Sequence, residues 1–265
     1  SIYNRKYFEN HHKIKIVHIE AGLRSFDERM PEEINRKLID QLSNILFVPT
    51  KVDIENLKKE RLLLNKKVFK VGNTISDVIK KNIPLIKKNN ILKTLKLLKD
   101  SYFLITLHRP ETVDDPVKFK KLILIFEKLG KKFNKRFIFP THPRTKKMIK
   151  KMDINRLNFI EFIDPLEFLD FLSLMKNSKI VFTDSGGVQE ETSLLGVPCI
   201  TIRKSTERQL TIKEKTNILT GYDYNKICNA IIYFNKNKIK ASKIFGDGNV
   251  ANKIFDKLKT IYKHN

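Results

Sequence analysis

The sequence predicts an α/β protein in which parallel strands alternate with helices that cover both faces of the sheet. Apolar stretches of strand length alternate along the chain with segments of helical period, a pattern typical of parallel sheets. The 265 residues are enough for one large domain or two domains of ordinary size. Hydrophobic residues make up 41% of the chain and charged residues 31%, which excludes a disordered chain and a bundle of membrane helices.

We expect eight strands, each an apolar stretch bounded by polar or turn-forming residues. The strands are predicted at residues 14–19, 44–49, 67–71, 102–107, 136–140, 158–163, 179–183 and 198–202. Nine helices are predicted, at about 31–43, 51–61, 73–82, 116–130, 144–152, 165–176, 187–195, 225–235 and 249–263. The helix at 116–130 has apolar residues at helical spacing, as expected of a helix packed on a sheet.

The stretch 84–100 divides the pattern into two α/β halves. It mixes Pro84, paired lysines and two asparagines without a strong period, which indicates a linker or a surface helix. The half before it holds only three of the predicted strands, few for a doubly wound domain. We therefore expect that half to lack its first part.

The formal net charge of +24 comes from 42 lysines and 11 arginines against 29 acidic residues. The basic residues are spread over the whole chain and are not concentrated in one segment with interleaved aromatics. This distribution favours a solvated, lysine-rich surface over a specific nucleic-acid site. A basic RNA-associated protein remains the non-enzymatic alternative.

Two further features bear on the cellular compartment. Cys199 and Cys228 are the only cysteines, too few for a disulfide framework or a cysteine-based zinc site. No apolar run approaches the roughly 18 residues of a spanning helix, and no signal peptide opens the chain. We therefore expect a reduced, cytoplasmic protein without membrane insertion.

The strongest local pattern is the strand at 179–183 followed by Ser185, Gly186 and Gly187 and then a helix. Glycines let the backbone approach a ligand closely, and free N–H groups at a helix start favour a phosphate. Glu191, about one turn into the helix, is placed to accept hydrogen bonds from a ribose diol. The alternative is a plain turn with capping residues, but the serine before the glycines and the glutamates after them favour a ligand site.

A second polar cluster follows the first strand, which ends at Glu20, at the edge of the sheet where α/β proteins bind ligands. Pro31 suits the first turn of the next helix, and the helix dipole favours the ionised Glu32 and Glu33 beside it. Such a charge pair is common in any helix and does not indicate function alone. Glu20 next to Gly22 is harder to explain structurally, and it points to function.

A third cluster, His108 and Arg109, follows the strand at 102–107. A histidine there can carry a proton or donate to a phosphate, and an arginine can pair with one. His142, in the run 140–144, repeats the arrangement one βα unit later, although a proline-bounded turn explains it equally well. Because these segments all end parallel strands, they predict one cleft that binds a nucleotide-linked substrate and carries proton chemistry.

Eight runs in the chain resemble those of the non-hydrolysing UDP-N-acetylglucosamine 2-epimerases, and the resemblance covers nearly the whole sequence. They are HIEAGLRS, MPEEINR, VGNTISDVI, THP, TDSGGVQEE, GVPCITIR, STER and FGDGNVA. The resemblance implies a GT-B-type fold, in which two Rossmann-like domains face a cleft. Residues 1–83 would be the remainder of the first domain, 84–100 a linker or surface segment, 101–242 the UDP-binding domain, and 243–265 a final helix that crosses back to the first domain.

The resemblance also implies roles for particular residues. Those implied as catalytic are Glu20, Glu32 and His108. Those implied to bind substrate are Phe171 at the uracil, Ser185, Gly186 and Gly187 at the diphosphate, Glu191 at the ribose, and Arg208 of the STER run, with Arg109 and His142 beside them. No metal and no redox cofactor is implied.

The implied reaction interconverts UDP-GlcNAc and UDP-ManNAc by elimination and re-addition of UDP through a glycal, which supplies ManNAc-type sugars for surface polysaccharide. A homodimer is expected of the full-length protein. The family's Gly-Thr-Arg-Pro-Glu turn and its Gly-Asp-Thr segment, which carries a catalytic Asp, are missing, so we expect this chain alone to bind UDP without epimerising it. The alternatives are a related sugar-nucleotide epimerase, acting on a UDP-2,3-diacetamido uronate or of the hydrolysing type, and a GT-B glycosyltransferase.

Overall fold

A computed structural model describes residues 14–141, 143–151 and 157–263 of the chain. The chain divides into two compact units, which are described separately. Unit 1 holds the residues up to Lys81, the segment Ser205–Leu210 and the C-terminal part from Lys243. Unit 2 holds Asn82–Lys204 and Thr211–Ser242.

Unit 1 is built on a three-stranded parallel sheet in the order β1-β2-β3. Its strands are β1 (Val17–Ile19), β2 (Ile45–Val48) and β3 (Lys67–Lys70). Its helices are α2 (Pro31–Leu42), α3 (Lys51–Lys59), the first half of α4 (Ile75–Lys88) and α13 (Val250–Lys263).

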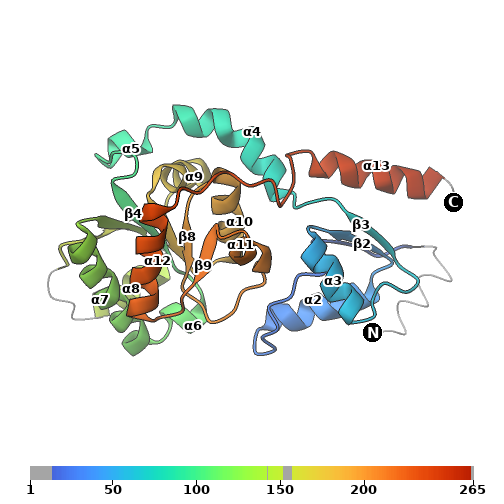
Figure 1. Ribbon diagram of the computed structural model, residues 1–265, viewed down its shortest axis with the longest axis horizontal. Coiled ribbons are helices and arrows are strands. Elements are labelled where there is room, and N and C mark those ends of the chain that lie inside the picture. Colours follow the sequence, from blue (N-terminus) through green and yellow to red (C-terminus); the bar gives the residue numbers. More distant parts are fainter. Residues whose placement is uncertain (1–13, 142, 152–156, 264–265) are drawn as a thin grey trace. The chain divides into compact units, whose positions relative to one another are not determined.

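The alternating side chains of β2 build two small cores on the two faces of this sheet. Ile45 and Phe47 pack with Val71 of the β3–α4 turn and with Val250, Ile254 and Ile261 of α13. Leu46 and Val48 pack on the other face with Ala21 and with Leu57 of α3. Figure 1 shows α13 and α3 on opposite sides of β2 and β3. The last helix of the chain thus completes the core of unit 1.

Unit 2 is built on a six-stranded parallel sheet in the order β6-β5-β4-β7-β8-β9. Its strands are β4 (Tyr102–Thr106), β5 (Arg136–Pro140), β6 (Ile160–Ile163), β7 (Ile180–Thr183), β8 (Cys199–Thr201) and β9 (Asn217–Leu219). Its helices are the second half of α4, α5 (Ile91–Thr94), α6 (Pro110–Val113), α7 (Pro116–Phe133), α8 (Pro143–Lys151), α9 (Phe168–Asn177), α10 (Gly186–Leu195), α11 (Gln209–Lys213, which begins in unit 1) and α12 (Tyr224–Lys236).

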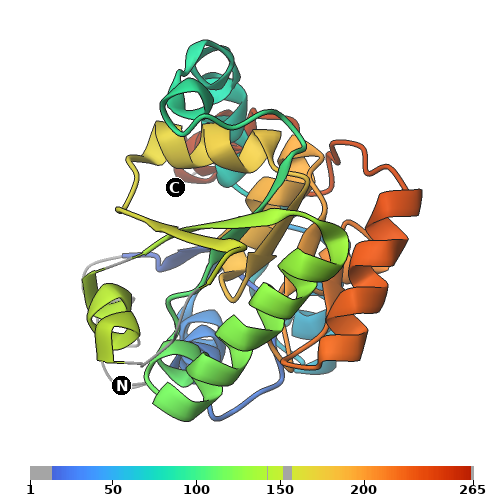
Figure 2. The same cartoon turned by 90° about the vertical axis from the view of Figure 1, so that its left-hand side faces the viewer.

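An aromatic cluster forms the centre of unit 2. The rings of Phe103 and Phe137 lie 5.0 Å apart and those of Phe126 and Phe182 lie 5.5 Å apart, centre to centre. Figure 2 shows α7 (green) and α12 (orange) along one face of the sheet and α9 (yellow) along the other. The strand order reverses between β4 and β7, so the carboxyl ends of these two neighbours form the switch point at which such sheets bind ligands.

The predicted α/β class is confirmed, with parallel sheets in two Rossmann-like units, and all eight predicted strands are present within a few residues. The ninth strand, β9, was not predicted because it is three residues long and begins with the polar Asn217. Helix α4 was predicted to end at residue 82 but continues through Pro84 to Lys88.

The contacts divide the chain differently from the predicted boundaries in two places. The stretch 84–100, predicted as a linker or a surface helix, holds the end of α4 and α5 and belongs to unit 2, where Ile86, Ile91 and Leu97 are buried. The side-chain amide of Asn89 also donates to the carboxylate of Asp170 on α9 at 2.6 Å. The segment Ser205–Leu210, predicted within 101–242, belongs to unit 1.

Within the described ranges, no helix is long and apolar enough to cross a membrane. The same residues contain no group of three or more histidine, cysteine, aspartate or glutamate side chains that could hold a metal ion. Cys199 and Cys228 are buried free thiols.

Candidate functional site

The loop after β1 begins with Glu20, whose φ of 68° places it in the left-handed region. This conformation is uncommon for a residue with a side chain and often marks a functional position. The next amide, that of Ala21, donates to the Phe47 carbonyl at 3.0 Å. Gly22 also has a positive φ, of 86°, and a Cβ there would lie 2.5 Å from the Asp53 carbonyl oxygen. Only glycine fits where this loop crosses α3.

Asp40, fully buried on α2, anchors the same loop. Its carboxylate accepts from the Gly22 amide at 3.1 Å and from His18 Nδ1 at 2.6 Å, and it pairs with Arg24 at 2.8 Å. Arg24 is itself fully buried and makes two further bonds to Glu60, at 2.8 and 2.7 Å. Burial lowers the pKa of Arg24, but the bonds to Glu60 and the charge of Asp40 outweigh it, so the net shift is upward.

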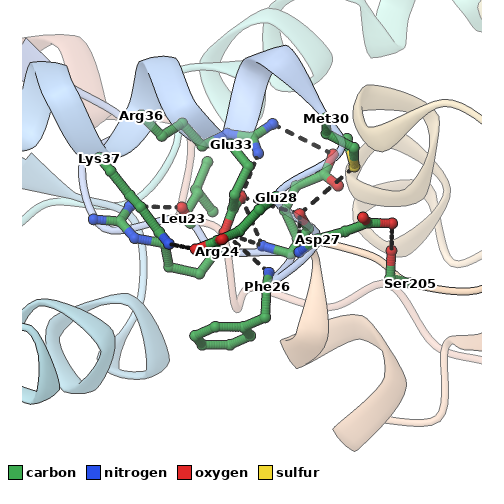
Figure 3. Close-up of polar contacts among 12 residues, drawn as sticks. Leu23, Arg24, Phe26, Asp27, Glu28, Met30, Glu33, Arg36, Lys37 and Ser205 are labelled. Carbon is green, nitrogen blue, oxygen red and sulfur yellow. Dashed lines mark hydrogen bonds and ion pairs between the residues drawn. The ribbon is translucent and has the colours of Figure 1, made fainter.

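Glu33, the buried member of the pair at the start of α2, holds the rest of the loop (Figure 3). Its carboxylate accepts from the amides of Ser25 and Phe26, both at 2.9 Å, and pairs with Arg36 at 2.9 Å. Glu32 lies next to it on the first helical turn with an exposed side chain. The expectation that both carboxylates sit near the positive end of the helix is confirmed, but their surroundings differ.

The STER segment packs against this loop within unit 1. Ser205 Oγ lies 3.5 Å from a carboxylate oxygen of Asp27 (Figure 3). The side-chain amide of Gln209 donates to the Arg24 carbonyl at 3.3 Å. Arg208, expected with the C-terminal unit, therefore lies with Glu20 and Glu32 in unit 1. Its side chain is buried.

The charge of Arg208 acts on the buried carboxylate of Asp53. Burial raises the pKa of Asp53 to about 6, and its bond to Thr50 and the charge of Arg208 counteract this rise. Its Oδ2 accepts from the Thr50 hydroxyl at 2.6 Å and from the Thr50 amide at 3.0 Å, which completes the capping box of α3. The start of α3 and the Arg208 guanidinium are thus electrostatically coupled.

In unit 2, His108 and Arg109 lie at the carboxyl end of β4, beside the end of β7. The fully buried Asp184 accepts from both of their amides, at 3.2 and 3.0 Å. The same carboxylate lies 3.3 Å from Nδ1 of His108. Nδ1 of His108 therefore faces Asp184, and the imidazole side chain is 56% exposed.

Ser185 occupies the N-cap of α10 with extended backbone, and its side chain makes no capping hydrogen bond. The Ser185 amide donates to Thr183 Oγ1 at 2.9 Å, which fixes the turn. A Cβ added at Gly187 would meet only Ser185 Oγ, 4.0 Å away, so there is open space beside the first turn. Amides at a helix N-terminus with room in front of them suit a phosphate.

Glu191 lies one turn further along α10. Burial raises the pKa of Glu191 to about 7. Phe171, implied at the uracil, lies half-buried on α9, which packs beside α10. Arg109 contacts Glu111 at 3.4 Å. His142 lies outside the described residues.

The structure thus gathers the expected residues into two groups. Glu20, the Glu32 turn and Arg208 lie in unit 1, whereas His108, Arg109, Phe171, the Ser185–Gly187 turn and Glu191 lie in unit 2. The residues that hold these groups were not expected from the sequence: Asp40, Asp184, Glu33 in its structural role, and Asn73 of the β3–α4 turn, whose side-chain amide donates to Glu20. Asp184, a charged residue at the end of an apolar strand, and Glu33, in the first turn of a helix, had a sequence signal.

Comparisons with known proteins identify the family that this sequence resembles. The family model described as UDP-N-acetylglucosamine 2-epimerase matches residues 9–259. A curated relative of that name from Methanococcus maripaludis is 43% identical over 259 residues, which cover 93% of this chain and 70% of the relative. A relative from Pseudomonas aeruginosa named UDP-2,3-diacetamido-2,3-dideoxy-D-glucuronate 2-epimerase is 36% identical to this chain. The match covers 92% of this chain and 68% of the relative.

Among solved structures, UDP-GlcNAc 2-epimerase from Methanocaldococcus jannaschii in complex with UDP-GlcNAc and UDP is similar over 98% of this chain and 72% of its own, with TM-score 0.86 and 39% identity. The Neisseria meningitidis enzyme bound to UDP-GlcNAc has TM-score 0.82 and 30% identity over 98% of this chain and 73% of its own. These likenesses confirm the expected GT-B-type class. The chain belongs to the UDP-N-acetylglucosamine 2-epimerase family.

Proposed function

We propose that this chain carries the site of a UDP-GlcNAc 2-epimerase, which interconverts UDP-GlcNAc and UDP-ManNAc. One observation carries the proposal: the open turn at Ser185–Gly187 directly follows the buried Asp184, which anchors His108. This arrangement suits a diphosphate leaving group with a hydrogen-bond donor beside it. It is supported by the likeness to an epimerase solved with UDP-GlcNAc and UDP.

The proposed roles in unit 2 concern the nucleotide. The amides at the start of α10 and the hydroxyl of Ser185 bind the diphosphate, and Gly186 and Gly187 let it approach the backbone. Glu191 accepts the ribose hydroxyls, Phe171 contacts the uracil, and Arg109 adds positive charge. His108 donates from Nε2 to the diphosphate as the bond to the sugar breaks. His142 is a further proposed contact.

The proposed roles in unit 1 concern the sugar and its proton. One carboxylate removes the proton from C2 while the C1–oxygen bond to UDP breaks, and a C1–C2 double bond forms. UDP then adds back at C1 while a proton is delivered to the opposite face of C2. Glu20 and Glu32 are the proposed carboxylates, and Arg208 is a proposed UDP contact. General acid–base catalysis of this kind contributes about 10²–10⁴-fold to the rate.

The test follows UDP-GlcNAc in D₂O by NMR, recording UDP-ManNAc formation and deuterium at C2. It is run on this chain and on the chain joined to the N-terminal segment of the Methanococcus maripaludis relative. Glu20→Gln and Glu32→Gln should each slow exchange by about 10²–10⁴-fold in whichever form is active, whereas the exposed Glu167→Gln should not. Absence of exchange from both forms, or wild-type exchange in both carboxylate variants, would refute the proposal.

A second candidate substrate is a UDP-2,3-diacetamido uronate, because the Pseudomonas aeruginosa relative named for that sugar is 36% identical to this chain. The chemistry at C2 would be the same, and the additional acetamido and carboxylate groups would have to be recognised. Measuring exchange with both substrates in parallel decides between them: the true substrate should show at least tenfold higher kcat/KM.

We also propose that the full-length protein is a homodimer located in the cytoplasm. The buried free thiols of Cys199 and Cys228 support a reducing compartment. Light scattering on the purified full-length protein tests the dimer, and fractionation of the source cells tests the location.

A further inference from the structure

We infer that Asn73 is a positioning residue that orients the carboxylate of Glu20. The inference rests on the proposed function, because it assumes that Glu20 carries proton chemistry. Asn73 lies in the turn between β3 and α4, and its side-chain amide donates to Glu20 Oε1. The two residues are 53 positions apart, and β1 and β3 are not neighbours in the sheet. Glu20 and Asn73 meet because β1 and β3 lie on either side of β2 and the carboxyl ends of the parallel strands lie together.

The Asn73 side chain has a defined orientation. It is 2% exposed, and its Oδ1 accepts from the Ile75 amide at 3.0 Å, at the start of α4. An amide oxygen used in this way leaves the NH₂ group directed at the carboxylate, so the hydrogen-bond pattern itself distinguishes oxygen from nitrogen. The Asn73 carbonyl accepts from the Ser76 amide at 3.0 Å and from the Ser76 hydroxyl at 2.8 Å.

The backbone of this turn is held by the segment that leads into α13. The Asn73 amide donates to the Phe245 carbonyl at 2.6 Å. Close approach requires glycine on both sides: a Cβ at Gly72 would lie 2.7 Å from the Phe245 oxygen, and a Cβ at Gly246 would lie 2.8 Å from Ser76 Oγ. Both glycines have a positive φ, of 99° and 122°. The turn therefore has little freedom to move away from Glu20.

Asp77, on α4, adds a second link between the β3–α4 turn and α13. Its carboxylate accepts from the amides of Val250 and Ala251, at 2.8 and 2.7 Å, at the start of α13. Because α13 is buried against β2 and the β3–α4 turn through Val250 and Ile254, the C-terminal helix, the turn and Glu20 form one connected structure. Asn73 transmits this rigidity to the carboxylate.

The chemical consequence is a carboxylate with one oxygen occupied. The bond to Oε1 restricts rotation of the Glu20 side chain and leaves Oε2 for the substrate. A displacement of about 1 Å of a reacting group can cost on the order of 10²-fold in rate, since proton transfer needs near-attack geometry. Loss of the bond should therefore lower kcat while leaving UDP-sugar binding largely unchanged, because the nucleotide contacts belong to other residues.

Asn73→Asp tests the inference with a nearly unchanged shape. An aspartate at this position keeps an oxygen acceptor for the Ile75 amide but faces Glu20 with a second carboxylate. Asn73→Ser removes the bond without adding a charge, because its short hydroxyl can accept from Ile75 without reaching Glu20. In the active form of the exchange assay, kcat should fall about 10²-fold or more for Asn73→Asp and less for Asn73→Ser, with KM within about threefold of wild type.

A double mutant separates positioning from general structural damage. In a Glu20→Gln background, adding Asn73→Asp should lower kcat by less than about a further threefold, because the carboxylate through which Asn73 acts is already lost. An equal fold-loss in both backgrounds would overturn the inference, and so would a wild-type kcat in Asn73→Asp.

A third measurement does not depend on activity. The side-chain amide resonance of Asn73 in the ¹⁵N-labelled chain should move in Glu20→Gln and stay in place in Glu32→Gln. An Asn73 resonance unmoved by Glu20→Gln would show that the contact is absent and would overturn the inference, whatever the kinetics. If the resonance moves but no form of the protein exchanges deuterium, the proposed function fails while the contact stands.

Discussion

The two units hold their functional residues in different ways. In unit 1 a small three-stranded sheet supports a long loop, and buried side chains such as Asp40, Arg24 and Glu33 fix its course. In unit 2 a six-stranded sheet with an aromatic core presents the backbone turn at Ser185–Gly187. The functional residues of unit 1 are held by individual charged side chains, whereas the turn in unit 2 depends mainly on main-chain geometry. Substitutions should therefore act differently in the two units.

The largest effect is expected from Arg24→Ala in unit 1. The substitution leaves Asp40 buried without its guanidinium partner, which should cost about 3–5 kcal/mol of stability. Urea unfolding with hydrogen exchange should show unit 1 opening while the strands of unit 2 stay protected. Arg29→Ala, which removes an exposed pair with Asp27, is the matched control and should have a much smaller effect. Equal losses in both variants would contradict the dependence of unit 1 on buried charge.

The next effect is a pH dependence in unit 2 that comes from Glu191. Because burial raises the pKa of Glu191 to about 7, the folded state keeps a proton that the unfolded state releases above its ordinary pKa of 4.5. The free energy of unfolding should therefore fall as the pH rises from about 4.5 to 7, by roughly 1–3 kcal/mol. Glu191→Gln should remove this part of the slope.

The same variant links stability to ligand binding. Ribose hydroxyls that donate to Glu191 favour its ionised form, so UDP affinity should rise with pH through about 7 more steeply in wild type than in Glu191→Gln. Calorimetric titration with UDP at pH 6 and pH 8 measures the affinity of the wild-type protein and of Glu191→Gln. Identical pH dependence in the two proteins would exclude Glu191 from the ribose site.

A moderate effect on binding alone is expected from Gly187→Ala. Its Cβ would enter open space beside the first turn of α10, so the fold should be unaffected while UDP affinity falls at least tenfold. Gly196→Ala is the reverse control: φ is 70° there and a Cβ would lie 2.6 Å from the Ala241 nitrogen, so stability should fall by about 1–3 kcal/mol. Loss of UDP affinity in the folded Gly196→Ala protein, or none in Gly187→Ala, would contradict the proposed diphosphate site.

The smallest effect compares one helix cap from each unit. Asp223→Ala removes a simple cap of α12, the bond from the Lys226 amide at 2.8 Å, and should cost about 1 kcal/mol. Thr50→Ala removes the corresponding cap of α3 and also a hydroxyl bond to the buried Asp53, so it should cost more. Thermal unfolding of both variants measures the difference, and equal costs would show that the Asp53 bond adds nothing.

Local patterns in the sequence were sufficient for most of the regular elements and for one half of the candidate site. The strand-to-glycine turn at 180–187 was predictable because strand, turn and helix follow one another directly, and each has its own residue signature. The helix at 116–130 was predictable from its apolar spacing and extends to Phe133. The three-residue strand β9 carried too little pattern to be recognised.

The sequence by itself determined the α/β class, the order of most strands and helices, and the residue types gathered at the strand ends, because periodicity and turn chemistry act between near neighbours in the chain. Only the tertiary structure decided which side chains contact and position the residues at the strand ends. Asn73 meets Glu20 across 53 positions, Asp40 meets His18 across 22, and Asp184 meets His108 across 76. Arg208 likewise joined unit 1 because its segment packs on the Arg24–Glu33 loop. Such pairings depend on how the strands align in the sheet and on where the last helix returns, and no local pattern records either.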